Sequence, residues 1–461
     1  MADESTQAAV QWLNERLSDA PELTPELFDE LRARQREQGL LHGDRPICSY
    51  LRPFLLPRAR YREITEAAET IAQAMERLVA RALEDDAVMS ELGLTEKEIA
   101  FAGIDPGYSP LCVNSRLDAF LTETDFKFLE YNAESPAGLT DGVLSENVFY
   151  DLPHMKEFLQ RFPHWRPQPH RQILPALLGA YREWSSKRGE TKERPNIAIV
   201  DWKGVATENE FHVLKRIFEA EGYQTVIADP HDLRYENGRL AVGDFEIDIL
   251  YKRVIIHEFL AKFDETHPVA RAYAEGKVCI ANSFRTKVAH KKASFSVLSD
   301  ERFSHLFTRE QLDCISRCIP WTRNVRRRRT IFENAEHDLI DLIKRKREEM
   351  VLKPNDDYGG HGVVLGAEVT DAEWDAHIAR ALEESFVVQQ RVAVRKELMP
   401  EFTDVLRWEE LLVDFDPFLF LNKAHGGIVR LSSSSLCNVS SGGGVTALLI
   451  LEDEATDAQP D

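Results

Sequence analysis

The sequence predicts a mixed α/β protein with more than one domain. Its 461 residues, 43% of them hydrophobic, are enough for a large core, and this length favours two or three domains. Segments with helical periodicity alternate with short apolar runs that are typical of strands. This alternation favours the α/β class.

The first part of the chain divides into a helical region and a region of strands and loops. Residues 1–100 are predicted to be helical, because apolar residues recur three and four positions apart, most clearly over residues 61–83. Residues 100–190 begin with strand-like runs broken by proline and glycine, and return to helix from residue 151. A polar stretch, SSKRGETKERP, then indicates a domain boundary.

The next part is a compact α/β unit over residues 195–282. Strands such as NIAIV and IDILY alternate with an amphipathic helix that ends at Gly222, in a Rossmann-like order. The turn after the first strand lacks the GxGxxG pattern, so a dinucleotide site is only weakly indicated. Residues 283–450 are rich in cations and helical at first, and strand-rich afterwards. Residues 451–461 are predicted to be a disordered acidic tail.

Charge and composition exclude several classes of partner. The net charge of −21 disfavours binding to nucleic acid or to an anionic membrane. The start of the chain lacks a signal-peptide pattern, and no apolar run approaches the roughly 20 residues that span a bilayer, so we expect a cytoplasmic protein. The six cysteines form no CxxC pair, which predicts reduced thiols instead of a zinc site.

Two short strands near residue 120 are predicted to bring four polar side chains together. Residues two apart on a strand face the same side, so Arg116 and Asp118 share one face. Glu130 and Asn132 share another. The polar link TETD favours a hairpin, and a turn centred on Thr124 places Asp118 opposite Glu130. The same turn places Arg116 opposite Asn132.

This constellation has the composition of a magnesium site. Two carboxylates and an amide oxygen at close range suit Mg²⁺, which accepts oxygen ligands and shares them with phosphates. Without a cation the carboxylates repel each other, which raises one pKa. Arg116 offsets this repulsion and is able to hold a phosphate or a substrate carboxylate by a two-pronged contact. A surface cluster of salt bridges on a hairpin is the alternative.

A glycine-rich turn follows a lysine in the segment MVLKPNDDYGGHGVV. Glycines 359, 360 and 362 allow backbone N–H groups to approach phosphate oxygens, and Lys353 supplies a point charge. The lysine precedes the glycines, so the segment is not a Walker A loop. The alternative is a glycine hairpin with a chance lysine.

Three further segments contribute candidates for nucleotide contacts. The strand that carries Gln389 and Gln390 fits the edge of an adenine pocket, although alone it is an ordinary strand. Arg430 lies on a strand beside glycine-rich loops and is a candidate for the transferred phosphate, or for a salt bridge. Lys291 and Lys292, at a helix start, are candidates for ATP phosphates.

Taken together, these motifs resemble the circularly permuted ATP-grasp proteins, whose relatives include the glutathionylspermidine synthetases. The resemblance rests on the order of R-x-D, E-x-N with a Pro/Gly loop, an α/β domain, a lysine helix, K-P with a glycine lid, and a late strand arginine. It covers roughly residues 100–445. The metal-ligand segment precedes the lid, as it does in the permuted relatives.

The resemblance implies ATP and Mg²⁺ as cofactors and an ATP-dependent carboxylate–amine ligase that forms an acyl phosphate and releases ADP and phosphate. The substrates would be a small carboxylate and an amine of the amino acid, peptide or polyamine class. An ATP-grasp kinase and a non-catalytic nucleotide-binding protein are the alternatives. The implied roles are metal ligation by Asp118, Glu130 and Asn132; support of the reacting phosphate by Arg116 and Arg430; and nucleotide contacts from Lys292, Lys353, Gly359, Gly360, Gly362, Gln389 and Gln390. The family's acidic pair before the helix lysine is replaced here by His290 and Lys291, which leaves the choice between Lys291 and Lys292 open.

Overall fold

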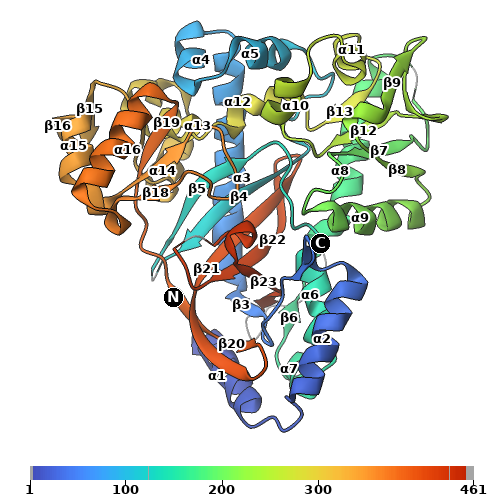
Figure 1. Ribbon diagram of the computed structural model, residues 1–461, viewed down its shortest axis with the longest axis vertical. Helices are drawn as coiled ribbons and strands as arrows, with labels where there is room; N and C mark the ends of the chain where they lie inside the picture. The colour runs from blue at the N-terminus through green and yellow to red at the C-terminus, as the bar shows by residue number, and fades with distance from the viewer. Residues whose placement is uncertain (1–3, 123, 190, 436, 453–461) are drawn as a thin grey trace.

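The computed structural model describes residues 4–122, 124–189, 191–435 and 437–452 (Figure 1). Three groups of helices and strands surround a central sheet, one at the upper left, one at the upper right and one below it (Figure 1). The chain is mixed α/β, as its alternating patterns predict. Within the described part, no helix is both long enough and apolar enough to cross a bilayer.

The N-terminal region is mainly helical, and its longest helix packs against the central sheet. Ile64 and Leu78 on helix α3 share one apolar cluster with Phe128 and Phe415 of the sheet, because apolar residues recur along one face of this helix. The prediction of helix throughout missed three short strands, since they form through tertiary pairing. The elements are α1 (Glu4–Ser18), α2 (Pro25–Gln38), β1 (Leu41–His42), β2 (Arg45–Pro46), β3 (Phe54–Pro57), α3 (Arg58–Ala82), α4 (Asp86–Leu92) and α5 (Glu96–Gly103).

The central sheet joins an early hairpin to strands from the end of the chain. Its order is β23-β22-β21-β4-β5. Strand β20 pairs with the first half of β21, residues 406–412. Strand β21 runs antiparallel to β4, with Phe418 opposite Arg116. Residues about 300 positions apart in the sequence therefore lie on neighbouring strands. The strands are β4 (Asn114–Leu121), β5 (Phe126–Asn132), β20 (Lys396–Phe402), β21 (Leu406–Phe420), β22 (Lys423–Ser432) and β23 (Gly444–Thr446).

A four-stranded parallel sheet, in the order β13-β12-β7-β8, is formed by the strands predicted over residues 195–282. Alternate residues of β7 join different apolar clusters: Ile197 and Ile199 join one, and Ala198 and Val200 the other. Both faces are thus covered, which explains the continuous apolar runs. The elements are α8 (Ile173–Ser186), β7 (Ile197–Val200), α9 (Glu208–Ala220), β8 (Thr225–Ala228), β9 (Leu233–Glu236), β10 (Arg239–Val242), β11 (Phe245–Glu246), β12 (Ile249–Lys252), α10 (Ile256–Lys262), α11 (Pro268–Ala274) and β13 (Cys279–Ala281).

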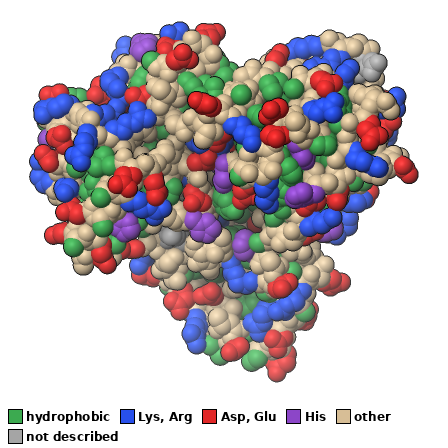
Figure 2. Space-filling view, turned by 45° about the horizontal axis from the view of Figure 1, so that its top comes forward, with side chains coloured by type: hydrophobic (Ala, Val, Ile, Leu, Met, Phe, Trp, Pro, Cys, Tyr) green, Lys and Arg blue, Asp and Glu red, His purple; other side chains and the backbone are tan. Residues whose placement is uncertain are grey.

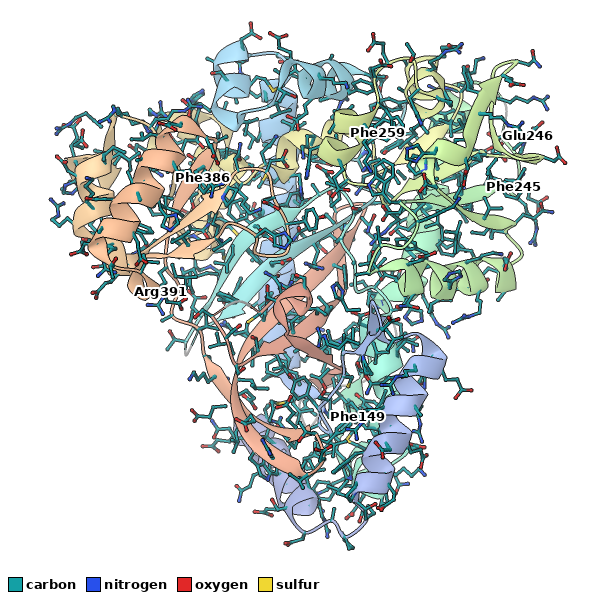
Figure 3. All side chains as sticks on the ribbon, viewed as in Figure 1. Phe149, Phe245, Glu246, Phe259, Phe386 and Arg391 are labelled. Carbon is teal, nitrogen blue, oxygen red and sulfur yellow. The ribbon has the colours of Figure 1, made fainter. Side chains whose placement is uncertain are left out.

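A second four-stranded sheet, in the order β14-β19-β17-β18, is antiparallel and carries the lysine and glutamine motifs. Phe386 and Arg391 mark the two ends of β19 in Figure 3, the first within the strand and the second just after it. Helices α15 and α16 cover this sheet through Leu342 and Trp374. The elements are α12 (Lys287–His290), α13 (Ala293–Ser299), α14 (Arg309–Cys318), β14 (Thr322–Asn324), β15 (Arg329–Phe332), β16 (Ala335–Asp338), α15 (Leu339–Arg345), β17 (Met350–Pro354), β18 (Val364–Leu365), α16 (Asp371–Glu383) and β19 (Phe386–Gln390).

The last strand of the described chain pairs with elements from its first half. Strand β24 runs parallel to β3 and antiparallel to β6. Leu451, the first residue of the predicted disordered tail, is the last residue of β24, and residues 453–461 lie outside the described part. The remaining elements are α6 (Asp141–Phe149), α7 (Pro153–Arg161), β6 (His164–Trp165) and β24 (Leu448–Leu451).

Candidate active site

The early hairpin has the register that the sequence predicts. Arg116 pairs with Asn132, and Asp118 pairs with Glu130. Arg116 donates two hydrogen bonds to the Asp118 carboxylate, at 2.8 and 3.0 Å. The Asn132 amide nitrogen lies 2.8 Å from Asp118 Oδ1 and 3.3 Å from Glu130 Oε1. All four side chains thus meet on one patch of the sheet.

Two buried aspartates that the sequence analysis missed complete this patch. Asp414 and Asp416 lie on β21, and the Arg430 guanidinium from β22 lies between them and Asp118. Arg430 Nη2 is 2.7 Å from Asp118 Oδ2 and 2.8 Å from Asp416 Oδ2, and it also contacts Asp414. The signal in the sequence was two acids spaced two apart, VDFDPF, within an otherwise apolar strand. Such a spacing points both carboxylates to the same face.

Burial and the arginines set opposite pKa shifts within this cluster. Burial opposes ionisation of Asp118, yet Arg116 and Arg430 hold the pKa of its carboxyl well below the usual range. For Asp416, burial outweighs Arg430 and raises the pKa well above the usual range. Oxygen atoms of Asp118, Asp414 and Asp416 lie within 4.8 Å of one another, but the guanidinium groups of Arg430 and Arg116 already supply positive charge to them. The Arg430 guanidinium therefore occupies the centre of this three-aspartate group, where a metal ion would otherwise lie.

Two lysines approach the hairpin from the second half of the chain. Lys353, on β17, donates a 2.7 Å hydrogen bond to Gln389 Oε1, and burial lowers its pKa to about 8. The Gln389 side chain thereby holds Lys353, while its amide nitrogen bonds Thr322. Lys292 Nζ lies 3.3 Å from Glu130 Oε2.

Lys291 points away from this site. Its ammonium lies 3.0 Å from Glu98 and 2.6 Å from Asp356. The helix α12 ends at His290 and α13 begins at Ala293, so the two lysines occupy a bend that sends their side chains in different directions. Of the two candidates, only Lys292 lines the cavity described next.

A cavity of about 390 Å³ brings most of the predicted residues together. Apolar side chains, including Val351 and Leu365, form part of its wall. Glu130 from the early hairpin and Lys353 from the later sheet both line it, although more than 200 positions separate them. The predicted site residues in its wall are Asp118, Glu130, Lys292, Lys353, Gly360, Gln389, Gln390 and Arg430.

A second cavity, of about 460 Å³, adjoins the first. Arg116, Asn132 and Gly359 line this second cavity instead of the first. It also lies at the carboxyl ends of β7 and β12, where the strand order of the parallel sheet reverses, and such switch points commonly bind ligands. In the space-filling view, histidine side chains gather near the centre of this face, where the three lobes meet (Figure 2). The residues common to both walls are Glu130, His361, Arg430 and Asn438.

The glycine-rich turn lies over the junction of the two cavities. Its three predicted glycines all have a positive φ, at +66°, +78° and +68°, which side chains rarely adopt. Tyr358 Oη donates a 2.9 Å hydrogen bond to Glu258 of α10, and the hydroxyls of Ser440 and Ser441 each lie 3.3 Å from Gly359 O. Gly362 lines neither cavity, and packs against Pro354.

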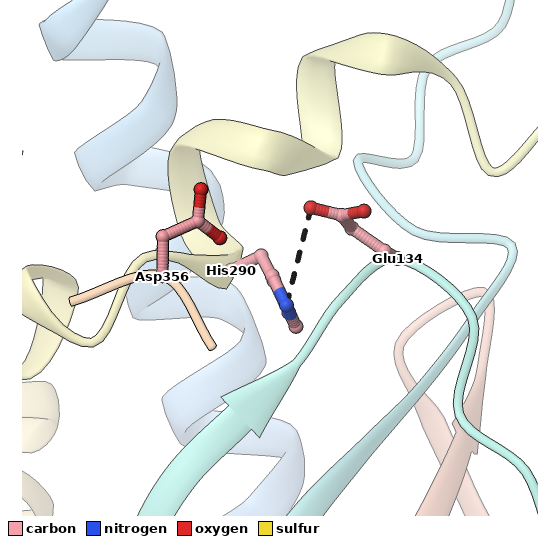
Figure 4. A group of neighbouring side chains, drawn as sticks. All are labelled: Glu134, His290 and Asp356. Carbon is pink, nitrogen blue, oxygen red and sulfur yellow. Dashed lines mark ion pairs between the residues drawn. The ribbon is translucent and has the colours of Figure 1, made fainter. Parts of the chain in front are cut away.

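A second charged group anchors the base of this turn. Carboxylate oxygens of Glu134 and Asp356 and a ring nitrogen of His290 lie within 4.8 Å of one another (Figure 4). The fully buried Lys287 ammonium lies 2.9 Å from Glu134 and also contacts Asp356, so it supplies the positive charge there. Burial lowers the pKa of His290 to about 4, which keeps the ring neutral. The group therefore fixes the loop of residues 134–140 to the start of the glycine-rich turn.

Comparison with known proteins identifies the type of fold. Protein-family models give no match to the chain. Uncharacterized proteins of Mycobacterium tuberculosis and Mycobacterium bovis are 23% identical over 363 residues, 72% of this chain, and the chain spans 59% of the length of these relatives. A glutathione synthetase-like effector from Globodera pallida, solved in its apo form, matches with a TM-score of 0.56 at 11% identity, over 92% of this chain and 96% of that protein.

The likeness to the Globodera protein shows the fold alone, which is of the ATP-grasp type. The sequence-based prediction of that fold is confirmed to this extent. A RimK domain ATP-grasp protein from Sphaerobacter thermophilus matches with a TM-score of 0.28 at 15% identity, over 55% of this chain and 90% of that protein. That match is too distant to add to the argument.

Proposed function

We propose that the protein is an ATP-dependent carboxylate–amine ligase of the circularly permuted ATP-grasp kind. It would form an acyl phosphate and release ADP and phosphate. One observation carries the proposal: the two lysines, the glycine-rich turn and the acidic hairpin line one cavity, which adjoins a second cavity at Glu130 and Arg430. The first would hold the nucleotide and the second the substrates.

The first cavity has the features that a nucleoside triphosphate requires. Lys292 and Lys353 provide the positive charges for phosphates, and Gly360 brings backbone to the cavity wall. The apolar wall and the end of β19 at Gln390 would enclose the adenine. Since the Gln389 carboxamide holds Lys353, we assign it to positioning that lysine instead of binding the base.

The hairpin residues fit a magnesium ion. The Asn132 amide nitrogen bridges the Asp118 and Glu130 carboxylates, and exchanging the amide's nitrogen and oxygen would turn three oxygens toward one point. Three such oxygens match the preference of Mg²⁺. The Glu130 side chain is 26% exposed, so it faces the cavity while Asp118 is held by its arginines. When bound, the ion would offset phosphate charge during transfer.

The chain's own residues would orient the reacting groups. Arg116 would hold the substrate carboxylate beside the γ-phosphate, and Arg430 would face the transferred phosphoryl group from the junction of the cavities. Lys353 and Lys292 would offset charge on the leaving ADP. An amine in the second cavity would then displace phosphate from the acyl phosphate. Such a reaction depends on positioning and electrostatics and needs no protein nucleophile.

The circular permutation is supported by the order of the motifs. The hairpin with Asp118 and Glu130 precedes the glycine-rich turn in the chain, and β4 pairs with β21 from near the end of the chain. The domain boundaries near residues 100, 195 and 283 stay predictions.

The direct test is a screen for ADP release. Amino acids, short peptides and polyamines would be supplied singly and in pairs with Mg·ATP, and the products identified by mass spectrometry. Release of ADP and phosphate that requires both a carboxylate and an amine, with an amide product, would support the ligase. A phosphorylated final product would support a kinase instead. Binding of Mg·ATP without turnover on any pair would support a non-catalytic role.

A further inference from the structure

A carboxylate–amine ligase requires a proton acceptor for its amine. Aliphatic amines carry a proton at neutral pH, with a pKa of about 10, and an ammonium has no free electron pair. The acceptor must lie in the second cavity, close to the groups proposed to hold the acyl phosphate. Asp141 lies in that wall together with Arg116, Glu130 and Arg430.

Two hydrogen bonds hold the backbone just before Asp141 in place. Asp141 is the first residue of α6 and follows the loop of residues 134–140. Arg116 Nη1 donates a 2.8 Å hydrogen bond to Ala137 O, and the Leu139 N–H donates a 2.6 Å hydrogen bond to Glu210. The same arginine that we assign to the reacting carboxylate thus fixes the loop that delivers Asp141.

Asp141 differs from the other carboxylates of this cavity in having no partner. Glu210 pairs with Arg253 at 3.2 Å, and Glu134 pairs with Lys287 at 2.9 Å. The Asp141 carboxylate makes no hydrogen bond or ion pair with any residue that the structure describes. A carboxylate in a cavity wall without a fixed partner is free to take up a proton from a bound ligand.

The charges around Asp141 suit a base that works near neutral pH. Burial raises its pKa to about 7, the nearby Glu210 carboxylate adds to this rise, and Arg116 opposes it. The buried Cys48 thiol also lies near the carboxylate, and burial keeps that thiol protonated by raising its pKa to about 11. Asp141 is therefore part ionised at neutral pH, and its ionised fraction increases as the pH rises through 7.

We propose that Asp141 is the general base that accepts the proton of the attacking amine. This inference rests on the proposed ligase function. The ammonium gives one proton to the Asp141 carboxylate, and the neutral amine then attacks the acyl carbon with its freed electron pair. The C–N bond forms while the bond from carbon to the phosphate oxygen breaks, and phosphate leaves with that electron pair and takes up the second amine proton. Asp141 finally returns its proton to solvent.

Hydroxylamine distinguishes loss of the general base from loss of acyl phosphate formation. It is largely uncharged at neutral pH, so it attacks the acyl phosphate without a base. The twenty amino acids and glutathione would be tested as carboxylates with Mg·ATP and hydroxylamine, and hydroxamates measured. For each active carboxylate, amide formation would be measured with a panel of amino acids and diamines. Asp141→Asn should lower amide formation by about 10²–10⁴-fold and leave hydroxamate formation near the wild-type rate.

The pH profile gives a second readout that a structural role would not change. Wild-type amide formation should decrease as the pH falls below about 7, and this acid limb should disappear in Asp141→Asn and persist in Asp141→Glu. Asp86→Asn is the matched control, since Asp86 is the exposed first residue of α4 and lies outside both cavities.

Three results would overturn the assignment. If Asp141→Asn forms the amide at the wild-type rate with an unchanged acid limb, Asp141 is not the general base. Equal loss of amide and hydroxamate reduces Asp141 to a structural residue. If the wild-type protein forms no hydroxamate with any of these carboxylates, the proposed acyl phosphate ligase function is wrong. The role of Asp141 as its general base is then wrong as well.

Discussion

Replacing Arg430 with methionine tests how much the guanidinium that contacts all three buried carboxylates stabilises the fold. Arg430 Nη2 lies 2.7 Å from Asp118 and 2.8 Å from Asp416, it contacts Asp414, and its side chain is only 8% exposed. Removing one partner of a buried ion pair costs about 3–5 kcal/mol of unfolding free energy. Burial already raises the pKa of Asp414 and Asp416, so these groups would take up protons in the variant. We therefore expect a loss near the lower limit, about 3 kcal/mol at neutral pH.

The sign of the pH dependence follows from the same carboxylates. Protonated carboxyl groups need no counter-charge, so the loss in Arg430→Met should shrink as the pH falls and grow as it rises. Adding Asp416→Asn should restore part of the stability, because an amide at this position needs neither a counter-charge nor a proton taken up from solvent. The double variant should thus be more stable than Arg430→Met alone.

Urea unfolding followed by tryptophan fluorescence measures these differences, and the chain has seven tryptophans. Because a chain of this size can unfold in steps, the midpoints of the transitions should be compared. Arg329→Met is the control: Arg329 pairs with Glu336 at 2.9 Å, but its side chain is 61% exposed, so we expect less than about 1 kcal/mol. Equal midpoints for Arg430→Met and Arg329→Met would refute the reasoning, as would a double variant less stable than Arg430→Met.

Three further changes test the site assignments. The double variant Asp118→Ala with Glu130→Ala should abolish Mg²⁺-dependent ATP binding, and unchanged affinity by calorimetry would remove the metal assignment. Lys292→Met should weaken Mg·ATP binding about tenfold or more, whereas Lys291→Met should mainly lower the melting temperature; the reverse pattern would exchange their roles. Tyr358→Phe removes the hydrogen bond to Glu258 and should increase protease cleavage in the glycine-rich turn of the nucleotide-free protein, and unchanged cleavage would show that this bond does not hold the turn.

Local sequence patterns predicted much of the candidate site. The hairpin register follows from the two-residue period of a strand and a short polar link, so the pairing of Asp118 with Glu130 needed no distant information. The glycine-rich turn and the strand of Lys353 were likewise visible from residue types alone. These features depend on neighbours within about twenty positions, which is the range that periodicity covers.

The parts that escaped prediction depend on distant pairing. Asp414 and Asp416 looked like two acids in an ordinary strand, and only the pairing of β21 with β4 brings them to Asp118. Lys287 lies in a segment that the sequence predicts only to be helical and cationic, and its role as the counter-charge of Glu134 is set by tertiary packing. The separate directions of the two helix lysines depend on a bend that no periodicity marks.

The pairing of β4 with β21 has a consequence for how the protein is made. The Ala119 N–H donates to Asp416 Oδ1, across 297 positions of the chain. At a translation rate of about 5–20 residues per second, the hairpin waits roughly 15–60 s on the ribosome for its neighbouring strand. During that time β4 presents an unpaired edge that can join another chain. Newly synthesised protein should therefore depend on chaperones until β21 has emerged, and slower translation should increase aggregation.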